Sequence, residues 1–365
     1  MAKKTYDKKT YDVIVIGAGP SGCRTAELVA RHGYKVLLIE EHKEIGEPVQ
    51  CAGLVSWRLK GLIHDLPADV VVNNITSAKF STSRTNFVLD SDSPVYVIDR
   101  SKLDKHLFEL AKFAGVEAKL GTRFKNFNRV KDFVEVVTNN GKFRTKLLVG
   151  ADGPDSIVAK QTNLTLPDNS LIGIQSTVNG VFDSNEVELW FNEHISPEFF
   201  GWVIPTGNST ARVGIATRDN AKKGFDNFLR GRLDLENVKP DVVGKINFGL
   251  IESSVAERIL LVGDAACQIK PFSGGGVIYG LIGAGYCARA CADALKEERF
   301  DAEFLARVYD ERWKSGLAKP IKRGLLYRKI FYGFDGRASD RRLNIILWLA
   351  KRFKFILGRL DMDLL

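Results

Sequence analysis

The chain has 365 residues, 45% of them hydrophobic and 27% charged, with a formal net charge of +9, which describes a globular protein too long for one small domain. Five cysteines at irregular spacings exclude a disulfide framework and a zinc pattern, the first ten residues lack the apolar core of a signal peptide, and no apolar run is as long as a membrane span. We therefore expect a cytoplasmic protein without a metal, and the absence of stacking modules and base-reading motifs argues against nucleic acid as a partner.

The first forty residues carry the strongest motif of the chain. Residues 13–16 form an apolar strand, and residues 35–39 form a second one that ends on Glu40. Between them lies a GxGxxG turn that contains Gly17, Gly19, Ser21 and Gly22. In such a turn the glycines allow a tight bend, a close approach to a pyrophosphate and close packing of the next helix. The helix N-terminus attracts phosphate, and Glu40 can accept a hydrogen bond from a ribose hydroxyl. This unit therefore predicts a site for the ADP half of FAD or NAD.

Strands, loops and helices alternate over residues 44–154. We predict a loop over 44–56, a short helix over 58–66 and strands outside the nucleotide-binding sheet within 67–93. A strand over 94–99 and a helix over 101–113 follow, and strands over 133–137 and 147–150 lead to a sharp turn at 151–154.

The second half of the chain predicts a different sheet. Alternating strands over 176–181, 186–191, 201–204 and 211–216 indicate an antiparallel sheet, which we assign to the substrate. A buried strand over 259–263 and helices over 274–294, 301–315 and 319–358 follow. We therefore predict an α/β (α+β) fold with a Rossmann-type nucleotide-binding domain (1–165 and 250–300), an interleaved antiparallel sheet domain (166–249) and a basic helical C-terminal region (301–365).

The positive charge is concentrated at the C-terminal end. Residues 319–365 contain twelve Lys or Arg and four Asp, a net charge of +8, together with Trp348, Phe353 and Phe355. Two interpretations stay open. Residues 343–357 form an interfacial helix on the inner face of an anionic membrane, or the segment is a basic helical cap that only packs on the protein.

Four further segments complete a recognisable set. They are residues 98–104 (IDRSKLD), 148–153 (LVGADG), 259–266 (ILLVGDAA) and 271–277 (PFSGGGV). With the glycine turn and Glu40, they closely resemble the flavoprotein family of aromatic hydroxylases and geranylgeranyl reductases over most of residues 11–295. The resemblance implies FAD as the cofactor, with Asp264 on its ribityl chain, Arg100 in contact with it, and Asp152 and Gly153 bracing the pyrophosphate region. It also implies cofactor contacts from Cys51, Ala52, Gly53, Thr122, Gly275, Gly276 and Val277.

Two segments resemble the geranylgeranyl reductase branch of this family. The loop from Pro48 to Leu54 is similar to the loop that places a cysteine beside the flavin ring, which makes Cys51 the catalytic candidate; its alternative role is a small buried hydrophobe. The run from Phe200 to Pro205 is similar to the aromatic substrate motif of that branch. The predicted substrate contacts are Trp190, Phe200, Trp202 and Pro205. His194 is a second, weaker candidate as a proton donor.

The resemblance implies an FAD-dependent reductase that saturates isolated C=C bonds of geranylgeranyl chains, with an archaeal-type digeranylgeranylglycerophospholipid as the expected prenyl lipid substrate. Hydride would come from N5 of the reduced flavin and a proton from an acid or water. The external electron donor stays open between ferredoxin, a reduced deazaflavin and NAD(P)H. The alternatives are an FAD-dependent monooxygenase of an aromatic or isoprenoid-quinone substrate, and a carrier that retained the fold without catalysis.

Overall fold

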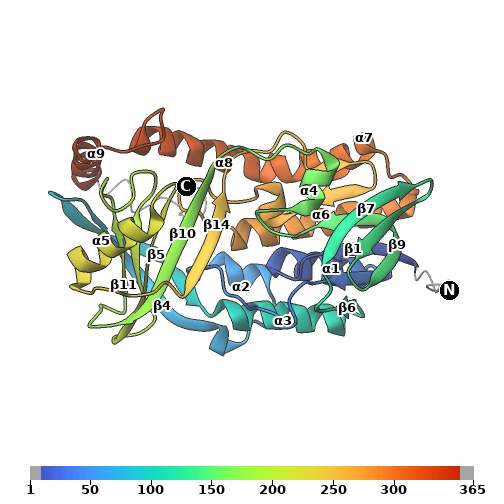
Figure 1. Cartoon of the computed structure of the whole chain (residues 1–365), viewed down its shortest axis with the longest axis horizontal. Coiled ribbons are helices and arrows are strands. Elements are labelled where there is room, and N and C mark those ends of the chain that lie inside the picture. The colour runs from blue at the N-terminus through green and yellow to red at the C-terminus, as the bar shows by residue number, and fades with distance from the viewer. Residues whose placement is uncertain (1–9, 354–365) are drawn as a thin grey trace.

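Two sheets built from interleaved parts of the chain lie end to end in the molecule (Figure 1). The computed structural model describes residues 10–353, with the backbone alone for Asp92. The fold is the α/β (α+β) fold expected from the sequence, with a Rossmann-type half, a largely antiparallel sheet and a helical C-terminal part.

The first sheet carries the nucleotide-binding turn. Its strand order is β15 (Val255–Ala256), β16 (Ile259–Leu261), β9 (Gly141–Gly150), β1 (Thr10–Ile16), β2 (Val36–Ile39) and β6 (Glu117–Lys119). The pairings from β16 to β6 are parallel, and β7 (Phe124–Val130) and β8 (Phe133–Thr138) extend antiparallel from β9. Every residue of β2 is buried, as expected for a strand covered on both faces. Helix α1 (Pro20–Arg31) packs against α3 (Arg100–Phe113) and α6 (Val277–Glu297).

The second sheet draws strands from both halves of the chain. Its order is β14 (Val242–Asn247), β10 (Ser170–Asn179), β13 (Thr210–Thr217), β12 (Gly201–Pro205), β11 (Glu186–Trp190), β4 (Val71–Ser81), β5 (Asn86–Ile98) and β3 (Leu54–Ser56). β4 and β11 pair in parallel and the other pairs are antiparallel. The chain thus leaves the first sheet after β2, builds three strands of the second sheet, and returns in α3.

Helices connect and cover the sheets. The short elements are α2 (Arg58–Leu62), η1 (Ala68–Val70), α4 (Ile157–Thr162), η2 (Gly263–Ala266), α7 (Ala302–Leu305) and η3 (Ala306–Asp310), and α5 (Ala221–Leu233) packs on one face of the second sheet. Helix α8 (Glu311–Tyr332) runs along the molecule from the first-sheet half to the second-sheet half, where α9 (Asp340–Arg352) follows (Figure 1).

The C-terminal helices differ from the sequence prediction in their boundaries. The predicted helices over 301–315 and 319–358 are instead α7, η3 and one α8 that contains Pro320, followed by a separate α9. The break falls at Gly333, whose φ of +72° ends α8, and Ser339 caps α9 by accepting a hydrogen bond from the Arg342 N–H. Residues 354–358 of the predicted helix lie outside the described residues. Helix α2 is shorter than the predicted 58–66, since it ends at Leu62, and α6 is shifted by three residues from the predicted 274–294 to Val277–Glu297.

Candidate active site

The GxGxxG turn is folded so that only glycine fits at two of its positions. Gly17 has a φ of +97°, and a Cβ there would overlap the carbonyl oxygen of Ala151. A Cβ on Gly22 would overlap the carbonyl oxygen of Gly17. At Gly19 a Cβ would meet nothing within 4 Å, and no side chain caps α1. The first N–H groups of α1 therefore lie at an open place that suits a phosphate.

Glu40 follows the last residue of β2 and lies beside this turn. Its Oε2 accepts a hydrogen bond from the Ala18 N–H at 2.8 Å, and its Oε1 accepts one from the His42 N–H at 2.9 Å. Thr122 lies against it, because the Thr122 N–H donates to the Glu40 carbonyl at 2.8 Å. Ser21, in the first turn of α1, packs against η2. The structure thus places Glu40, Thr122 and Ser21, with the glycines, around one end of the first sheet.

Asp264, Gly276 and Arg100 come from three separate motif segments and lie around one site. A Cβ on Gly276 would come within 2.8 Å of Asp264 Oδ1, so η2 and the start of α6 are in contact. Arg100 donates from Nε and Nη2 to the two carboxylate oxygens of Asp104, each at 3.1 Å. Burial raises the pKa of Asp264 above its ordinary value, and the nearby Arg100 charge opposes that rise.

Asp152 binds backbone at the start of α4. Its carboxylate accepts hydrogen bonds from Ser156 Oγ at 2.6 Å, from the Ile157 N–H at 2.7 Å and from the Val158 N–H at 3.1 Å. Burial nevertheless raises its pKa. These bonds hold the turn at Ala151, which packs over Gly17, so Asp152 shapes the nucleotide turn from behind.

Cys51 lies on a loop that is held by an arginine the sequence analysis did not single out. Arg212 on β13 donates from Nη1 to the carbonyls of Ala52 and Ile98, both at 2.9 Å. Gly53 has a φ of +77°, and a Cβ on it would overlap Arg212 Nη1. The Gly53 N–H donates to Cys51 Sγ at 3.3 Å. The available signal for Arg212 was a charged residue inside an otherwise apolar strand.

Two guanidinium groups therefore approach the Cys51 loop, Arg212 from β13 of the second sheet and Arg100 from the start of α3. Burial lowers the pKa of Arg212, while the Cys51 sulfur opposes that effect. For Arg100 burial also acts to lower the pKa, but the attraction of Asp104 and of the Cys51 sulfur outweighs it, so its pKa is raised. Both side chains stay protonated and present positive charge to the loop at neutral pH.

A cavity of about 290 Å³ joins this loop to the second sheet. It brings together the predicted residues of three segments, which are Cys51, Ala52, Gly53, Gly275, Gly276, Val277, Phe200 and Trp202. Its remaining wall is mostly apolar and includes Leu54, Ile75, Leu89, Val95, Val187 and Leu189 from β3, β4, β5 and β11. The sequence analysis missed these wall residues because their strands were not assigned to one sheet face. The cavity is thus mostly apolar, and the glycine-rich start of α6 forms part of its wall.

Trp202 is fixed in the wall of this cavity. Its Nε1 donates to Gln175 Oε1 at 2.9 Å, and a Cβ on Gly214 would come within 2.5 Å of its ring. Phe199 and Phe200 stack beside it with ring centroids 4.1 Å apart. The aromatic wall is therefore held by a buried hydrogen bond and close packing.

Two predicted substrate residues do not line the cavity. Trp190 lies on the opposite face of the second sheet, where its ring centroid is 6.2 Å from that of Phe228 in α5 and its Nε1 donates to Glu188. The reason is strand alternation, since Leu189 faces the cavity and its neighbour must face away. Pro205 ends β12 and its carbonyl accepts from Asn73 Nδ2 at 2.9 Å. The structure therefore does not support Trp190 or Pro205 as wall residues.

The other candidates are remote from the cavity. His194 is exposed at the surface. Cys23, Cys287 and Cys291 are buried among apolar residues of the first-sheet core, which fits a structural role.

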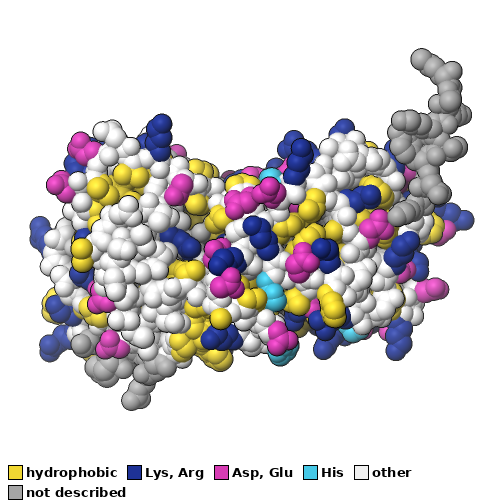
Figure 2. Space-filling model, turned by 90° about the horizontal axis from the view of Figure 1, so that it is seen from below, with side chains coloured by type: hydrophobic (Ala, Val, Ile, Leu, Met, Phe, Trp, Pro, Cys, Tyr) yellow, Lys and Arg dark blue, Asp and Glu magenta, His cyan; other side chains and the backbone are white. Residues whose placement is uncertain are grey.

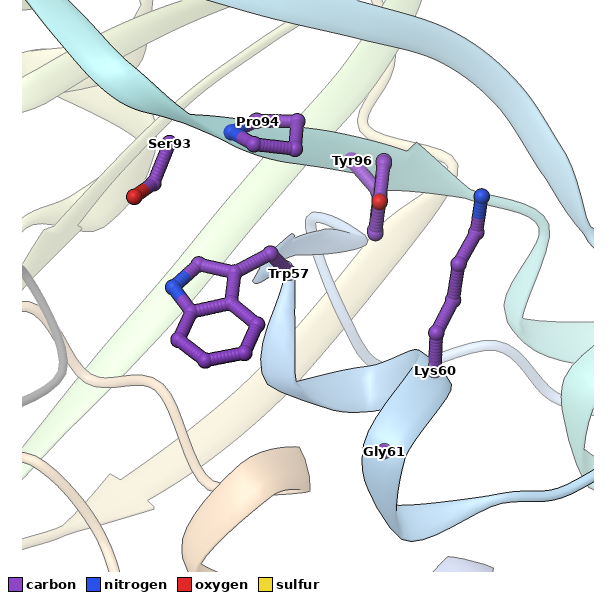
Figure 3. Close-up of a pocket in the computed structure, with 6 residues that line it drawn as sticks. All are labelled: Trp57, Lys60, Gly61, Ser93, Pro94 and Tyr96. Atoms are coloured by element: carbon purple, nitrogen blue, oxygen red, sulfur yellow. The ribbon is translucent and has the colours of Figure 1, made fainter.

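A separate open depression of about 590 Å³ lies outside β3 and β5, between Trp57, Lys60 and Tyr96. There Lys60 Nζ is 4.8 Å from the Tyr96 ring centroid (Figure 3). None of the residues predicted for the site lies in it.

Comparison with known proteins decides the family. The model of the FAD binding domain family matches residues 10–312. The chain belongs to this family. It is also 30% identical to digeranylgeranylglycerophospholipid reductase 1 of Methanococcoides burtonii, over 95% of this chain and 93% of the relative. Identity to the digeranylgeranylglycerophospholipid reductase of Methanocaldococcus jannaschii is 32%, over 92% of this chain and 89% of the relative. Within the FAD-binding family, the chain thus groups with the geranylgeranyl reductases.

Solved structures agree on the fold. A geranylgeranyl bacteriochlorophyll reductase-like protein from Thermoplasma acidophilum superposes with a TM-score of 0.85 at 24% identity, over 98% of this chain and 93% of that one. A halogenase solved in complex with FAD superposes with a TM-score of 0.72 at 16% identity, over 93% and 80% of the two chains. Both structural similarities show that this chain shares its fold with those proteins.

FAD is the cofactor of this family, and the residues present fit it. The open N-terminus of α1 suits the pyrophosphate, and Glu40 lies where a ribose would follow. The N-terminus of α6 carries no side-chain cap either, and it opens at Gly276 into the cavity. A helix N-terminus at that place suits the negative charge of a reduced flavin. No helix among residues 10–353 is both long and apolar enough to cross a membrane.

Proposed function

We propose that this protein saturates isolated C=C bonds in the geranylgeranyl chains of a digeranylgeranylglycerophospholipid. The observation that supports this most is the single cavity that joins the Cys51 loop and the glycine-rich start of α6 to an apolar, aromatic wall. A prenyl chain needs a long apolar slot and no hydrogen-bonding partners along its length. The names of the relatives, which are reductases of this lipid, point to the same substrate.

The chain's residues act by binding and orientation. Reduced FAD supplies hydride when bound, and an isolated alkene offers no carbonyl that a side chain could polarise. The apolar wall around Trp202 and Phe200 therefore has to hold the alkene in one orientation and exclude water. The α6 N-terminus at Gly276 stabilises negative charge on the cofactor side of the cavity.

Cys51 is the proposed catalytic residue. Its sulfur accepts a hydrogen bond from the Gly53 N–H and faces Arg100, so its position in the cavity wall is fixed. We assign it to shaping the site and relaying a proton to the alkene carbon. A Cys51→Ser variant retains a proton-bearing group, whereas Cys51→Ala does not, so lipid reduction should fall much further in the alanine variant.

The direct test is anaerobic. The protein-bound flavin is reduced with dithionite, the digeranylgeranylglycerophospholipid is added, and flavin reoxidation is followed together with the mass of the lipid. Reoxidation with stepwise gains of about 2 Da per double bond would establish the reductase and count the bonds that react. A flavin that stays reduced with the lipid, but reoxidises in oxygen with hydroxylation of an added aromatic or quinone substrate, would replace the proposal with a monooxygenase. Protein without bound flavin would leave a carrier.

The same assay can identify the electron donor. Ferredoxin, a reduced deazaflavin and NAD(P)H are compared by the rate at which each reduces the bound flavin before lipid is added. A donor that supports repeated turnover replaces dithionite in the assay.

We also infer that the protein works at the inner face of an anionic membrane, through α9. Leu343 and Leu347 of this helix are buried in the same apolar cluster as Phe199, Phe200 and Trp202. The opposite side carries Ile345, Trp348 and Leu349, exposed by 52%, 56% and 44%.

Basic residues surround that exposed stripe. Arg341, Ile345, Trp348 and Arg352 follow one another at spacings of four, three and four residues, so they share one face of α9. Exposed apolar residues flanked by arginine are typical of a helix that lies on an anionic lipid surface. By contrast, the face seen from below in Figure 2 carries basic and acidic side chains intermixed. Because α9 covers the apolar cluster that includes Phe200 and Trp202 of the cavity wall, a membrane bound at α9 would lie next to that wall.

A further inference from the structure

Arg328 on α8 is buried beneath the cavity wall and binds two separate loops. Its Nη2 donates to the carbonyl of Glu198 at 2.8 Å, and its Nη1 donates to the carbonyl of Pro271 at 3.3 Å. The guanidinium carbon lies 4.0 Å from the ring centroid of Phe248 and 5.0 Å from that of Tyr332. Burial lowers its pKa to about 10, so it stays charged at neutral pH. The Arg328 guanidinium thus binds two backbone segments at once, one at Glu198 and one at Pro271.

Both segments lead directly into the active site. Pro271 begins the loop that ends in Gly274–Gly276 and opens α6, on the cofactor side of the cavity. Glu198 precedes Phe199 and Phe200, which form the wall on the lipid side. Residues of both segments therefore line the same cavity.

A buried arginine is a costly way to fill this space. Removing a guanidinium from water carries a large desolvation penalty. An apolar side chain of similar volume could pack among Phe248, Phe199 and Tyr332 with a smaller penalty. What an apolar side chain lacks is the ability to donate to two carbonyls at once in a fixed geometry. The specific contribution of Arg328 is therefore to set the relative position of the two loops.

Arg337 provides a natural comparison. Its Nε donates to the Glu198 carboxylate at 3.0 Å and its Nη2 donates to Asp219 at 3.0 Å. Thr217 Oγ1 also donates to that carboxylate at 2.6 Å. Arg337 thus anchors Glu198 by its side chain, and within residues 10–353 it makes no hydrogen bond to Pro271. Both arginines bind Glu198, and of the two Arg328 alone also binds the loop at Pro271.

We propose that Arg328 is a positioning residue, which fixes the separation between the loop that opens α6 and the Phe199–Phe200 wall and so the width of the cavity where the lipid meets the cofactor. This inference rests on the proposed function for its substrate, and on the two carbonyl contacts for its mechanics. Arg328 itself touches neither the cofactor nor the lipid in this assignment.

The test compares Arg328→Gln, Arg328→Lys and Arg337→Gln by hydrogen exchange of the FAD-loaded protein and by lipid kinetics. Arg328→Gln should speed amide exchange in both 196–204 and 268–277, and lower kcat for lipid by about 10- to 100-fold with a small change in KM. Arg328→Lys should restore one carbonyl contact and give intermediate values. Arg337→Gln should change exchange near Glu198 and Asp219 and leave 268–277 at the wild-type rate.

The outcomes separate this inference from the proposed function. If Arg328→Gln leaves exchange of 268–277 unchanged, or if Arg337→Gln lowers kcat equally, Arg328 does not link the two loops. If the wild-type protein fails to reduce the lipid, the proposed function is wrong, and the exchange data on 196–204 and 268–277 still decide whether the link exists. Should Arg328→Gln not fold, Arg328→Lys carries the same comparison.

Discussion

Arg212 on β13 donates to the carbonyl of Ala52 at 2.9 Å, in the loop that leads from β2 of the first sheet to β3 of the second. The catalytic candidate Cys51 is therefore anchored to the substrate sheet, although its loop follows the first βαβ unit in the chain. A movement of β13 would be transmitted directly to the Cys51 loop. Gly53 makes this contact possible, because any larger residue would occupy the position of the Arg212 guanidinium.

Replacing Gly53 by alanine should therefore displace Arg212 and the Cys51 loop. The expected loss of unfolding free energy is about 2–4 kcal/mol, from a residue held at positive φ and a broken buried hydrogen bond. Gly115→Ala is the matched control, since Gly115 has a φ of +93° and a Cβ there would meet nothing within 4 Å. Denaturant unfolding of both variants isolates the contribution of the Arg212 contact. Equal losses in the two variants would mean that the contact is unimportant.

Asp264→Asn should stabilise the protein without FAD at neutral pH. Burial raises the pKa of Asp264, so the folded state binds its proton more tightly than the unfolded state does. The resulting destabilisation is present above the folded pKa and disappears as the pH falls through it toward the ordinary aspartate value of 3.8.

The asparagine variant should therefore exceed wild type by on the order of 1 kcal/mol at pH 7, with the difference shrinking in acid. Its affinity for FAD should fall about tenfold, because a charged hydrogen-bond acceptor is lost. Thermal unfolding across pH and flavin titration measure the two effects. A variant that is less stable than wild type at pH 7 would contradict this account.

Trp202→Phe should weaken both the wall and lipid binding. The substitution leaves Gln175 Oε1 without its partner in an apolar wall, which costs about 1–3 kcal/mol of unfolding free energy. Adding Gln175→Leu should recover part of that loss, and a double-mutant cycle measures the coupling. KM for the lipid should rise in both variants. If the losses of unfolding free energy from the two substitutions simply add, the Trp202–Gln175 hydrogen bond does not fix the indole ring.

Glutamate at Ile345 and Trp348 should abolish binding to anionic vesicles. The two substitutions remove the exposed apolar stripe of α9 and place negative charge among its arginines. Co-sedimentation with vesicles of phosphatidylglycerol and phosphatidylcholine should fall by at least about tenfold, and wild-type binding should weaken with salt.

The matched control for α9 is Phe113→Glu, because Phe113 is an exposed phenylalanine on α3. It should bind vesicles as wild type does. Lipid reduction in detergent should be unchanged in the α9 variant, whereas reduction of vesicle lipid should fall. If vesicle binding survives the two glutamates, α9 is a packing helix and the basic cap interpretation replaces the membrane surface.

The sequence predicted the elements of the site better than their relative placement. The spacing from Gly17 to Glu40 is local, because a strand, a turn and a helix determine it within thirty residues. The faces of the second sheet depend on register between distant strands, which is why Trp190 was assigned to the wall although Leu189 faces the cavity.

The contacts of Arg212 and Arg328 with loop carbonyls could not be predicted from the sequence for the same reason. Arg212 and Arg328 act on carbonyls that are far away in the chain, and a carbonyl leaves no mark in a sequence. The end of α8 at Gly333 was missed because a helical pattern of apolar residues continues on both sides of it. The Rossmann half, the antiparallel sheet and the helical end were all confirmed at the level of fold.

The interleaving of the chain has a consequence during synthesis. β4 and β5 are made early, but β11, the partner of β4 at the centre of the second sheet, is residues 186–190. A ribosome must therefore add about a hundred residues while one side of β4 has no strand to pair with. Pairing of such distant strands is slow. The nascent chain thus leaves one edge of β4 unpaired for several seconds, and this edge can pair with other chains until β11 is made.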